Sequence, residues 1–340
     1  MCRHVCPVGH VTSRETLTPH AWALTIESVR RQQLAWNDET AAVMYACADC
    51  GLCRTHCVTD QPLPDAIVDA RADIVRHGKA PAAVLEFQKH LEAALPAVDV
   101  PRADRILFVG RERRSAGSTE VAAALRLLDA ASLAVEPAGE HASTGLVASS
   151  LGLVDLAARL ARDLVAAIEA SGAREILVLG PADKWTFEYV YPTRLGVPWP
   201  ADVIVTEVTT ALASAHGNGS LHLSRRLGLP PAYHDPCHSP RTGRDGKAPR
   251  RLLGAIYGDQ AGPELFWRET RAHPCGAIGG LDITQPDLAR RLALARLKDA
   301  AHSGAATLVT DDPLCLAHLS ANAESDVTVV GLFSQLAQCV

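Results

Sequence analysis

The chain has 340 residues, of which 48% are hydrophobic and 21% charged, and its formal net charge is -5. This composition fits a globular protein with two or three domains, and the mild, evenly spread charge excludes the basic surface that nucleic acid or an anionic membrane would require. No apolar run reaches the roughly 20 residues of a membrane helix and the first residues lack a signal-peptide pattern, so we expect a cytoplasmic protein without direct membrane insertion.

The ten cysteines are unevenly distributed along the chain. Six of them lie in the first 57 residues, and the next one is Cys237. In a reducing compartment, cysteines are more often metal ligands or catalytic thiols than disulfides. The distribution therefore predicts an N-terminal cofactor module followed by a larger body.

The N-terminal part is predicted to be helical. Apolar residues at helical spacing and prolines at helix starts predict helices over 18–33, 38–45, 65–77 and 81–95. The first two helices would separate two cysteine-containing loops. Residues 96–104 alternate prolines with charges and are expected to form a linker.

From Arg105 onward, short apolar runs alternate with helical patterns. The strands predicted here are 106–109, 175–179, a strand before His234, a strand near 264–268, and 307–310. The helices predicted here are 119–130, 153–171, 247–257 and 285–302. The alternation predicts parallel sheets covered by helices, with one α/β unit present twice. The whole chain is therefore expected to be α+β.

The densest cysteine motif is ACADCGLCRTHC, in which Cys47, Cys50, Cys53 and Cys57 form a CxxCxxCxxxC run. This spacing is typical of a loop that wraps thiolates around a [4Fe-4S] cluster. In two-cluster ferredoxin modules, the last cysteine of each run binds the cluster of the other run. A partner run is therefore expected elsewhere in the chain.

The partner run is CRHVCP at 2–7, which has the ending of such a motif but lacks two upstream cysteines. Crossed ligation predicts one complete [4Fe-4S] cluster, held by Cys6, Cys47, Cys50 and Cys53. Cys2 and Cys57 would belong to a second, incomplete cluster. We expect the natural chain to begin farther upstream and to bind both clusters; the alternative is true loss of one site. A zinc site or inert thiols are the other interpretations of the group, although zinc sites usually separate two CxxC pairs more widely.

The two α/β units follow one plan. The second contains YHDPCH, HPCGAIGG and DDPLC, which place Cys237, Cys275 and Cys315 near strand ends. The first contains FVGR, STG and GPAD at similar spacing, without cysteine. The glycines of HPCGAIGG lack the spacing of a phosphate loop and are expected to form tight turns.

A ferredoxin-like module followed by two such units resembles a family of iron–sulfur subunits. The family includes the D subunit of heterodisulfide reductase, the C subunit of anaerobic glycerol-3-phosphate dehydrogenase and the iron–sulfur subunit of glycolate oxidase. The resemblance covers nearly the whole chain. It implies a helical ferredoxin-like [4Fe-4S] module over 1–95 and two cysteine-rich, CCG-type α/β repeats over 105–222 and 230–340. In that family each repeat carries cysteines that hold a non-cubane cluster or another metal centre.

Against that pattern, the cysteine-rich repeats of this chain are degenerate. The first repeat has lost its ligands and is expected to bind no metal. In the second, the resemblance implies a metal or Fe-S site at Cys237, Cys275 and Cys315, with Asp312, His234, His238 or His273 as the fourth ligand. The alternative is that these are buried free cysteines left from an ancestral site.

The resemblance implies an iron–sulfur electron-transfer subunit, rather than a stand-alone catalyst, in a flavin-linked dehydrogenase or heterodisulfide-reductase-like complex. The expected partners are a flavoprotein dehydrogenase or oxidase subunit and, for peripheral attachment to the membrane, a quinone-reducing subunit. Two alternatives stay open. One is a thiol-disulfide or quinone reductase acting at Cys237, Cys275 and Cys315, and the other is an assembly scaffold with a structural cluster.

Overall fold

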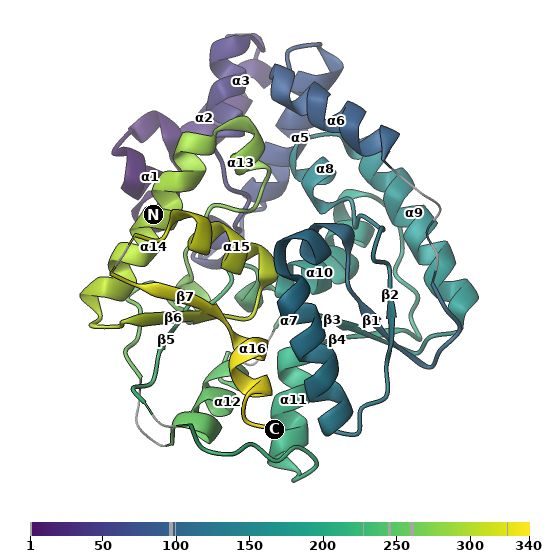
Figure 1. Cartoon of the computed structure of the whole chain (residues 1–340). Helices are drawn as coiled ribbons and strands as arrows, with labels where there is room; N and C mark the ends of the chain where they lie inside the picture. The colour runs from purple at the N-terminus through teal and green to yellow at the C-terminus, as the bar shows by residue number, and fades with distance from the viewer. Residues whose placement is uncertain are drawn as a thin grey trace.

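The computed structural model contains an N-terminal group of helices and two parallel sheets (Figure 1). It describes residues 2–94, 98, 100–226, 228–243, 246–258, 262–324 and 326–340, with 112–117 described by their backbone alone. The predicted α+β class with parallel sheets is confirmed. The expected linker over 96–104 lies partly outside the described residues.

Helices form over the four N-terminal segments predicted to be helical, and two short α-helices that were not predicted accompany them. Their bounds are α1 (Pro7–Thr12), α2 (Pro19–Arg30), α3 (Asp38–Tyr45), α4 (Leu52–Thr55), α5 (Leu63–Arg76) and α6 (Ala82–Ala93). Pro19 occupies the first turn of α2, where a missing N–H costs nothing. Asn37 caps the start of α3 in a capping box. The Asn37 side chain accepts from the Thr40 N–H, and the Thr40 hydroxyl accepts from the Asn37 N–H. A short 3-10 helix over Cys2–Val5 precedes α1.

The first sheet has the strand order β2-β1-β3-β4, with all strands parallel. The strands are β1 (Arg105–Phe108), β2 (Glu136–Ala138), β3 (Glu175–Val178) and β4 (Ile204–Glu207). The helices are α7 (Arg111–Ala130), α8 (Leu146–Ser150), α9 (Val154–Ser171), α10 (Pro181–Trp185), a π-helix (Thr186–Arg194) and α11 (Val208–Gly217). The predicted helix over 119–130 is the C-terminal half of α7.

The second sheet has the order β5-β6-β7, again parallel. Its strands are β5 (Ala232–Tyr233), β6 (Thr307–Thr310) and β7 (Thr328–Gly331). Its helices are α12 (Ala248–Tyr257), α13 (Leu281–Thr284), α14 (Pro286–His302), α15 (Pro313–Asn322) and α16 (Leu332–Ala337), with 3-10 turns at Ser239–Arg241 and Glu269–Arg271.

The strand predicted near 264–268 is wrong, because this segment is a loop. The backbone N–H groups of Phe266 and Trp267 donate to the Asp299 carboxylate of α14, at 3.3 and 3.4 Å. A side-chain acceptor therefore takes the place of a neighbouring strand. The apolar run reflects burial of Leu265 rather than sheet pairing.

The two α/β units share one hydrophobic core. Helix α7 of the first unit packs against α15 and α16 of the second (Figure 1). The core includes Leu107, Leu127, Leu177, Leu212, Leu252, Val309 and Phe333, drawn from both units. Each unit therefore buries its apolar surface against the other as well as within itself.

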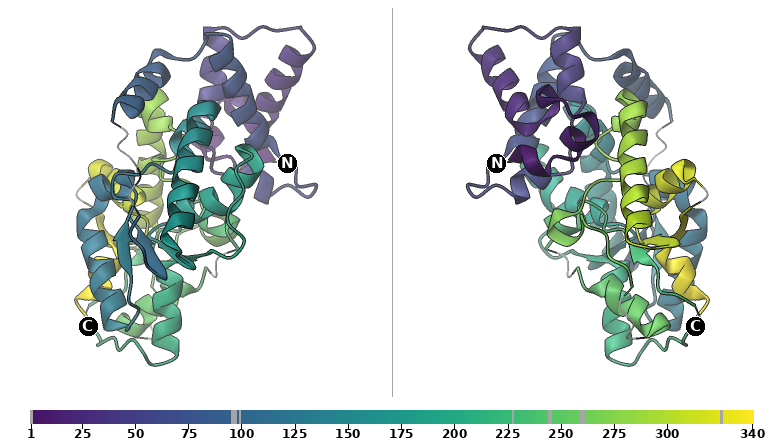
Figure 2. Two further views of the ribbon diagram at one scale, coloured as in Figure 1. Left: turned by 90° about the vertical axis from the view of Figure 1, so that its right-hand side faces the viewer. Right: turned by 90° about the vertical axis from the view of Figure 1, so that its left-hand side faces the viewer.

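The N-terminal helices lie at one end of the molecule, against both units (Figure 2). Their core contains Trp22, Met44 and Ile67 and continues into Leu156 of the first unit and Leu288 of the second. The cysteine loops are thereby placed where three parts of the chain meet. No helix among the described residues is long and apolar enough to cross a bilayer.

Candidate metal and cluster sites

Four of the N-terminal cysteines come from two separate loops. Cys6 precedes the first turn of α1, and Cys47 follows α3. Cys50 and Cys53 lie before and within the short helix α4, which packs against the 3-10 helix of the first loop. Cys6, Cys47 and Cys50 are buried, and Cys53 is part-buried.

The surroundings of these four thiols oppose their ionisation. Burial raises the pKa of Cys47 to about 12, and it raises the pKa of Cys6, Cys50 and Cys53 as well. After burial, the next causes for the raised pKa of Cys53 are the charges of Cys47, Cys50 and Cys6. Thiols in this situation become thiolates only when a metal centre supplies positive charge. The structure thus brings together the four residues predicted to hold the cluster.

The loop that carries Cys47 and Cys50 is held on one side by Arg71 of α5, whose side chain is fully buried. Its guanidinium donates to the carbonyls of Met44 and Cys47, and also to those of Ser150 and Gly279, at 2.5 to 3.2 Å. One arginine therefore binds the cysteine loop to both α/β units.

A second buried interaction holds the same loop. The Asp49 carboxylate accepts two hydrogen bonds from Arg194, at 2.8 and 2.9 Å, and one from the Ser150 hydroxyl. Burial by itself would raise the pKa of Asp49, but Arg194 more than offsets this and the pKa is lowered. Asp49 is therefore a buried carboxylate with its charge paired, rather than a free acid.

Cys2 and Cys57 have different surroundings. Cys2 lies in the first 3-10 helix and is close enough to Cys53 to raise the pKa of that thiol. The Cys57 sulfur lies 3.3 Å from the Thr59 hydroxyl, and hydrogen bonds from Thr59 and Gln61 lower the pKa of Cys57. Pairing of Cys2 with Cys57 in a second cluster stays a prediction.

The second group of predicted residues also comes together. Cys237, Cys275, Cys315 and Asp312 line one small cavity of about 10 Å³. The cavity lies beyond the carboxyl ends of β5 and β6, where ligands of parallel sheets usually bind. Its volume is about what a single water molecule needs, which suits one ion better than a multi-iron cluster.

Among the histidines named from the sequence, His234 has the geometry of a metal ligand. Its ring and the sulfurs of Cys275 and Cys315 offer ligand atoms that all lie within 4.8 Å of one another. The two sulfurs are 3.2 Å apart, and the His234 Nε2 is buried with no hydrogen-bond partner among the described residues. Two thiolates and an imidazole form a donor set that suits zinc or iron.

The other proposed fourth ligands are not part of this group of three close ligand atoms, although the Nε2 of His273 also lacks a hydrogen-bond partner among the described residues. The Asp312 carboxylate caps α15 by accepting from the N–H groups of Leu314 and Cys315. His238 stacks on Trp185 with ring centroids 4.3 Å apart, and its Nε2 lies 3.2 Å from the Asp49 carbonyl. His273 stacks on Trp267 at 4.1 Å.

The protonation of the second group also fits metal binding. Burial, with a further contribution from Arg296, lowers the pKa of His234 to about 3, so its ring is neutral at physiological pH. A hydrogen bond with Cys275, followed by burial, raises the pKa of Cys315 well above its usual value. The Cys315 thiol is therefore protonated until a cation displaces the proton.

The two cysteine groups are neighbours. Cys50 of the N-terminal loop and Cys237 of the second unit belong to one small hydrophobic cluster with Val5 and Leu52. Burial raises the pKa of Cys237, and the next causes are the charges of Cys50 and Cys275. Cys237 thus lies between the two groups of thiols.

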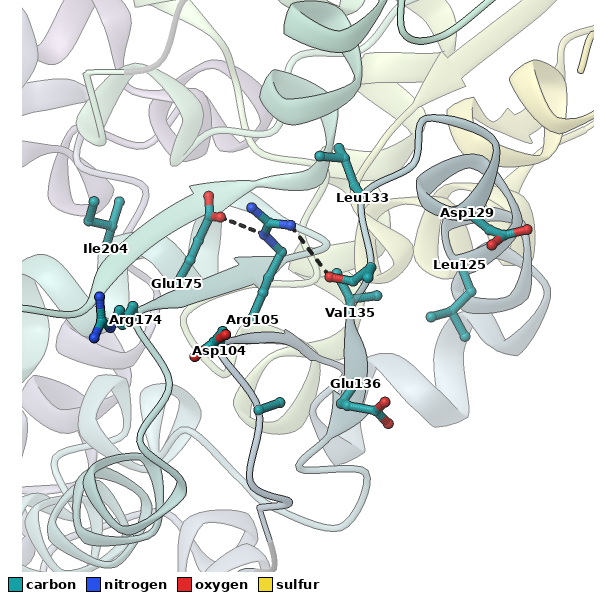
Figure 3. A pocket seen from close by; sticks show the side chains of 12 residues that line it. Asp104, Arg105, Leu125, Asp129, Leu133, Val135, Glu136, Arg174, Glu175 and Ile204 are labelled. Carbon is teal, nitrogen blue, oxygen red and sulfur yellow. Dashed lines mark hydrogen bonds and ion pairs between the residues drawn. The ribbon is translucent and has the colours of Figure 1, made fainter.

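A larger cavity, of about 990 Å³, lies elsewhere and carries no comparable chemistry (Figure 3). Its lining includes the first residues of β1, β2, β3 and β4, so it opens at the amino ends of the first sheet. Ligands of parallel sheets bind at the opposite ends. Arg105 is held there by the Glu175 carboxylate and the Ala134 carbonyl, and no cysteine or histidine is among the described residues that line the cavity.

Sequence reasoning missed one charged residue beside the cysteines. Arg241 lies in the 3-10 turn after Cys237 and is close enough to Cys50 and Cys53 for its charge to be affected by theirs. Its three guanidinium nitrogens are buried and have no hydrogen-bond partner among the described residues. The only hint of Arg241 in the sequence is that it follows the candidate ligand Cys237 by four residues.

Comparison with known proteins finds similarity to a cysteine-rich domain family and to two named redox proteins. Residues 231–320 match the family of the cysteine-rich (CCG) domain. Over 325 residues, 87% of this chain and 78% of the relative, the chain is 26% identical to the D subunit of dihydromethanophenazine:CoB–CoM heterodisulfide reductase from Methanosarcina barkeri. It is also 26% identical to a probable membrane-anchored ferredoxin of Chromohalobacter salexigens, over 82% of this chain and 45% of that protein.

The fold is also found among solved structures. A hypothetical protein from Helicobacter pylori superimposes with a TM-score of 0.54 over 92% of this chain and 66% of its own, at 10% identity. At that identity the likeness concerns the fold alone.

Proposed function

We propose that this chain, which carries a CCG cysteine-rich domain, is an electron-transfer subunit of an oxidoreductase complex. Over most of its length it is related to iron–sulfur subunits of such complexes. The cluster would be a [4Fe-4S] centre held by Cys6, Cys47, Cys50 and Cys53. Electrons would come from a flavoprotein dehydrogenase or oxidase subunit and leave to a second centre, a quinone or another carrier.

One observation supports this proposal above the others: the four thiols come from two loops that pack against each other, and three of the four, Cys6, Cys47 and Cys50, are buried. Each thiolate of a cubane binds its own iron, so the sulfurs need to surround a common space rather than touch. When bound, such a cluster supplies reversible one-electron chemistry. The described residues bury the site and fix its loops through Arg71 and Asp49, which limits reorganisation during transfer.

We propose a separate role for the group at Cys275, Cys315 and His234, as the site of a single zinc or iron ion. Cys237 lies beside it and next to the N-terminal cysteines. Zinc would make the site structural, whereas iron would add a redox centre next to the cluster. The two α/β units would dock the partner subunits.

The test of the proposed cluster is anaerobic purification of the full chain with measurement of iron and acid-labile sulfide. We expect about four of each per chain at the N-terminal site, and Cys47→Ala should remove most of both. Cys339→Ala is the matched control, because Cys339 is buried near the C-terminus, where its sulfur donates to the Gln335 carbonyl. Unchanged iron and sulfide in Cys47→Ala would contradict the proposed ligand set.

The short distance between the Cys275 and Cys315 sulfurs favours one second candidate, thiol-disulfide chemistry at this pair. The cavity of about 10 Å³ leaves no room for a disulfide substrate, which argues against it. Cys275→Ala distinguishes the two: loss of bound zinc or iron supports the metal site. Loss of a disulfide reductase activity in a metal-free protein would support the alternative.

A further inference from the structure

A buried cation, the guanidinium of Arg241, lies against the N-terminal cysteine site. The guanidinium of Arg241 is enclosed, and none of its three nitrogens makes a hydrogen bond within the described part of the chain. The side chain packs on the cysteine loop, since a Cβ built on Gly51 would lie 3.2 Å from the Arg241 Nε. Buried guanidinium groups normally have hydrogen-bonded counter-charges, so this one points to a missing negative group.

Two acids of the cysteine region are bonded to other cations. Asp49 is bonded to Arg194, and Asp60 is bonded to Arg54 on the surface of the same region. The negative groups that interact with Arg241 are instead the sulfurs of Cys50, Cys237 and Cys53, in that order. Two of these three belong to the proposed cluster.

We propose that Arg241 is the counter-charge of the N-terminal cluster and raises its reduction potential. This inference rests on the proposed function, because it requires the cluster to be present. Reduction adds one electron to a centre that is already negative, with no bond made or broken, so a fixed positive charge beside it favours the reduced form. Burial makes the effect larger, because low-dielectric surroundings screen the charge weakly.

Arg241 also lies near Cys237, the thiol between the two cysteine groups. It is therefore a positioning and tuning residue at the junction of the two proposed sites. Arg71, Arg194 and Arg54, the other arginines bonded to this region, have carbonyls or carboxylates as partners. Arg54 and Arg194 are paired with carboxylates, whereas the buried Arg71 is hydrogen-bonded to neutral carbonyls.

The test is a potentiometric titration of the full chain, monitored by electron paramagnetic resonance, with dithionite as the reductant. Arg241→Gln should shift the reduction equilibrium at least about tenfold toward the oxidised form, which is about 59 mV for one electron. Arg241→Lys should keep most of the potential, because it keeps the charge. Arg54→Gln, a control at a paired and part-exposed arginine, should move it less than about threefold.

A second measurement covers the case in which Arg241→Gln does not retain the cluster. In the metal-free chain the unpaired cation is unfavourable, so Arg241→Gln should raise the melting temperature while it lowers cluster retention. A variant that holds the cluster at an unchanged potential, or a metal-free variant that is no more stable, would overturn the inference. A wild-type protein without iron and sulfide would instead contradict the proposed function.

Discussion

Three buried arginines surround the N-terminal cysteines, and each is stabilised differently. Arg71 donates to four backbone carbonyls, and Arg194 donates to the carboxylates of Asp49 and Asp65. Arg241 has no such partner among the described residues. A chain that places this much positive charge around buried thiols is suited to a negatively charged centre.

At the residue scale, Arg71→Met should strongly destabilise the protein. The change leaves the carbonyls of Met44, Cys47, Ser150 and Gly279 buried without their donor, and each unsatisfied group is unfavourable. We expect the free energy of unfolding to fall by about 3 kcal/mol or more, measured by urea unfolding of the metal-free protein. Arg76→Met on the exposed face of α5 is the control and should change it by less than about 0.5 kcal/mol. Equal effects of the two variants would contradict this role of Arg71.

Functional residues could be predicted from the sequence only where they belong to a local motif. The cysteines of the N-terminal site were found by their spacing, because short loops around a cluster impose it. His234 was one of several possible fourth ligands, and only the fold brought its ring to Cys275 and Cys315. Arg241 has no motif at all, since its relation to Cys50 arises from contact between distant segments.

At the element scale, the glycine turn of HPCGAIGG has a role beyond chain reversal. Gly279 has a φ of 73°, which favours glycine, and a Cβ there would lie 2.5 Å from the Ala48 carbonyl oxygen. Ala48 lies between Cys47 and Cys50. The turn therefore allows the second unit to approach the cysteine loop closely.

Gly279→Ala should therefore lower iron and sulfide content as well as stability. The added methyl group would displace the loop that carries Cys47, and occupancy should fall to about half or less. Gly304→Ala is a matched control, because Gly304 also has a positive φ, of 83°, but has no atom within 4 Å of the built Cβ. Gly304→Ala should lose only the conformational contribution, of about 1–2 kcal/mol, and keep its cluster. Loss of iron in both variants to the same extent would show that close approach is not the cause.

The same scale shows where pattern-based prediction of elements succeeds. Helix α3 and strand β6 have the predicted bounds, because a capping residue and an apolar run define them locally. Strands β2, β4 and β7 were missed, since they are short and border their sheets, where fewer side chains are buried. The segment 264–268 was misassigned because its N–H groups bond to Asp299, 32 and 33 residues away in sequence.

At the scale of the whole molecule, Glu120 is one of the carboxylates that link the two α/β units; Asp311, which accepts from Thr209, is another. Glu120 of α7 accepts hydrogen bonds from the backbone N–H groups of Phe333 and Ser334 and from the Ser334 hydroxyl, at the start of α16. A residue larger than glycine does not fit at position 331, because a Cβ on Gly331 would overlap the Glu120 carboxylate. Glu120 thus satisfies the first N–H groups of a helix in the other unit.

This contact should make stability depend on pH. Burial raises the pKa of Glu120, and the hydrogen bonds from Ser334 and Phe333 offset this only in part. Since the folded pKa lies above the unfolded value of about 4.3, folding favours the protonated acid. Its contribution is therefore fully present below the unfolded pKa and is lost as pH rises through the folded pKa.

Glu120→Gln should remove that pH dependence. Urea unfolding between about pH 4 and 8 should show the wild type losing stability relative to the variant as pH rises. Glu169→Gln, at an exposed position of α9, is the control and should follow the wild type. Parallel profiles for wild type and Glu120→Gln would mean that the Glu120 pKa is not shifted on folding.

The sequence by itself determined the class of the protein and the candidate ligand cysteines, because local spacing and periodicity carry that information. Only the tertiary structure decided that the two α/β units share a core, that the two cysteine groups meet at Cys50 and Cys237, and that Arg241 lies beside them. These features depend on contacts between segments far apart in the chain. Motifs and periodicity mark some of these residues, such as Cys50 and Cys237, but they do not say which distant segments pack against each other.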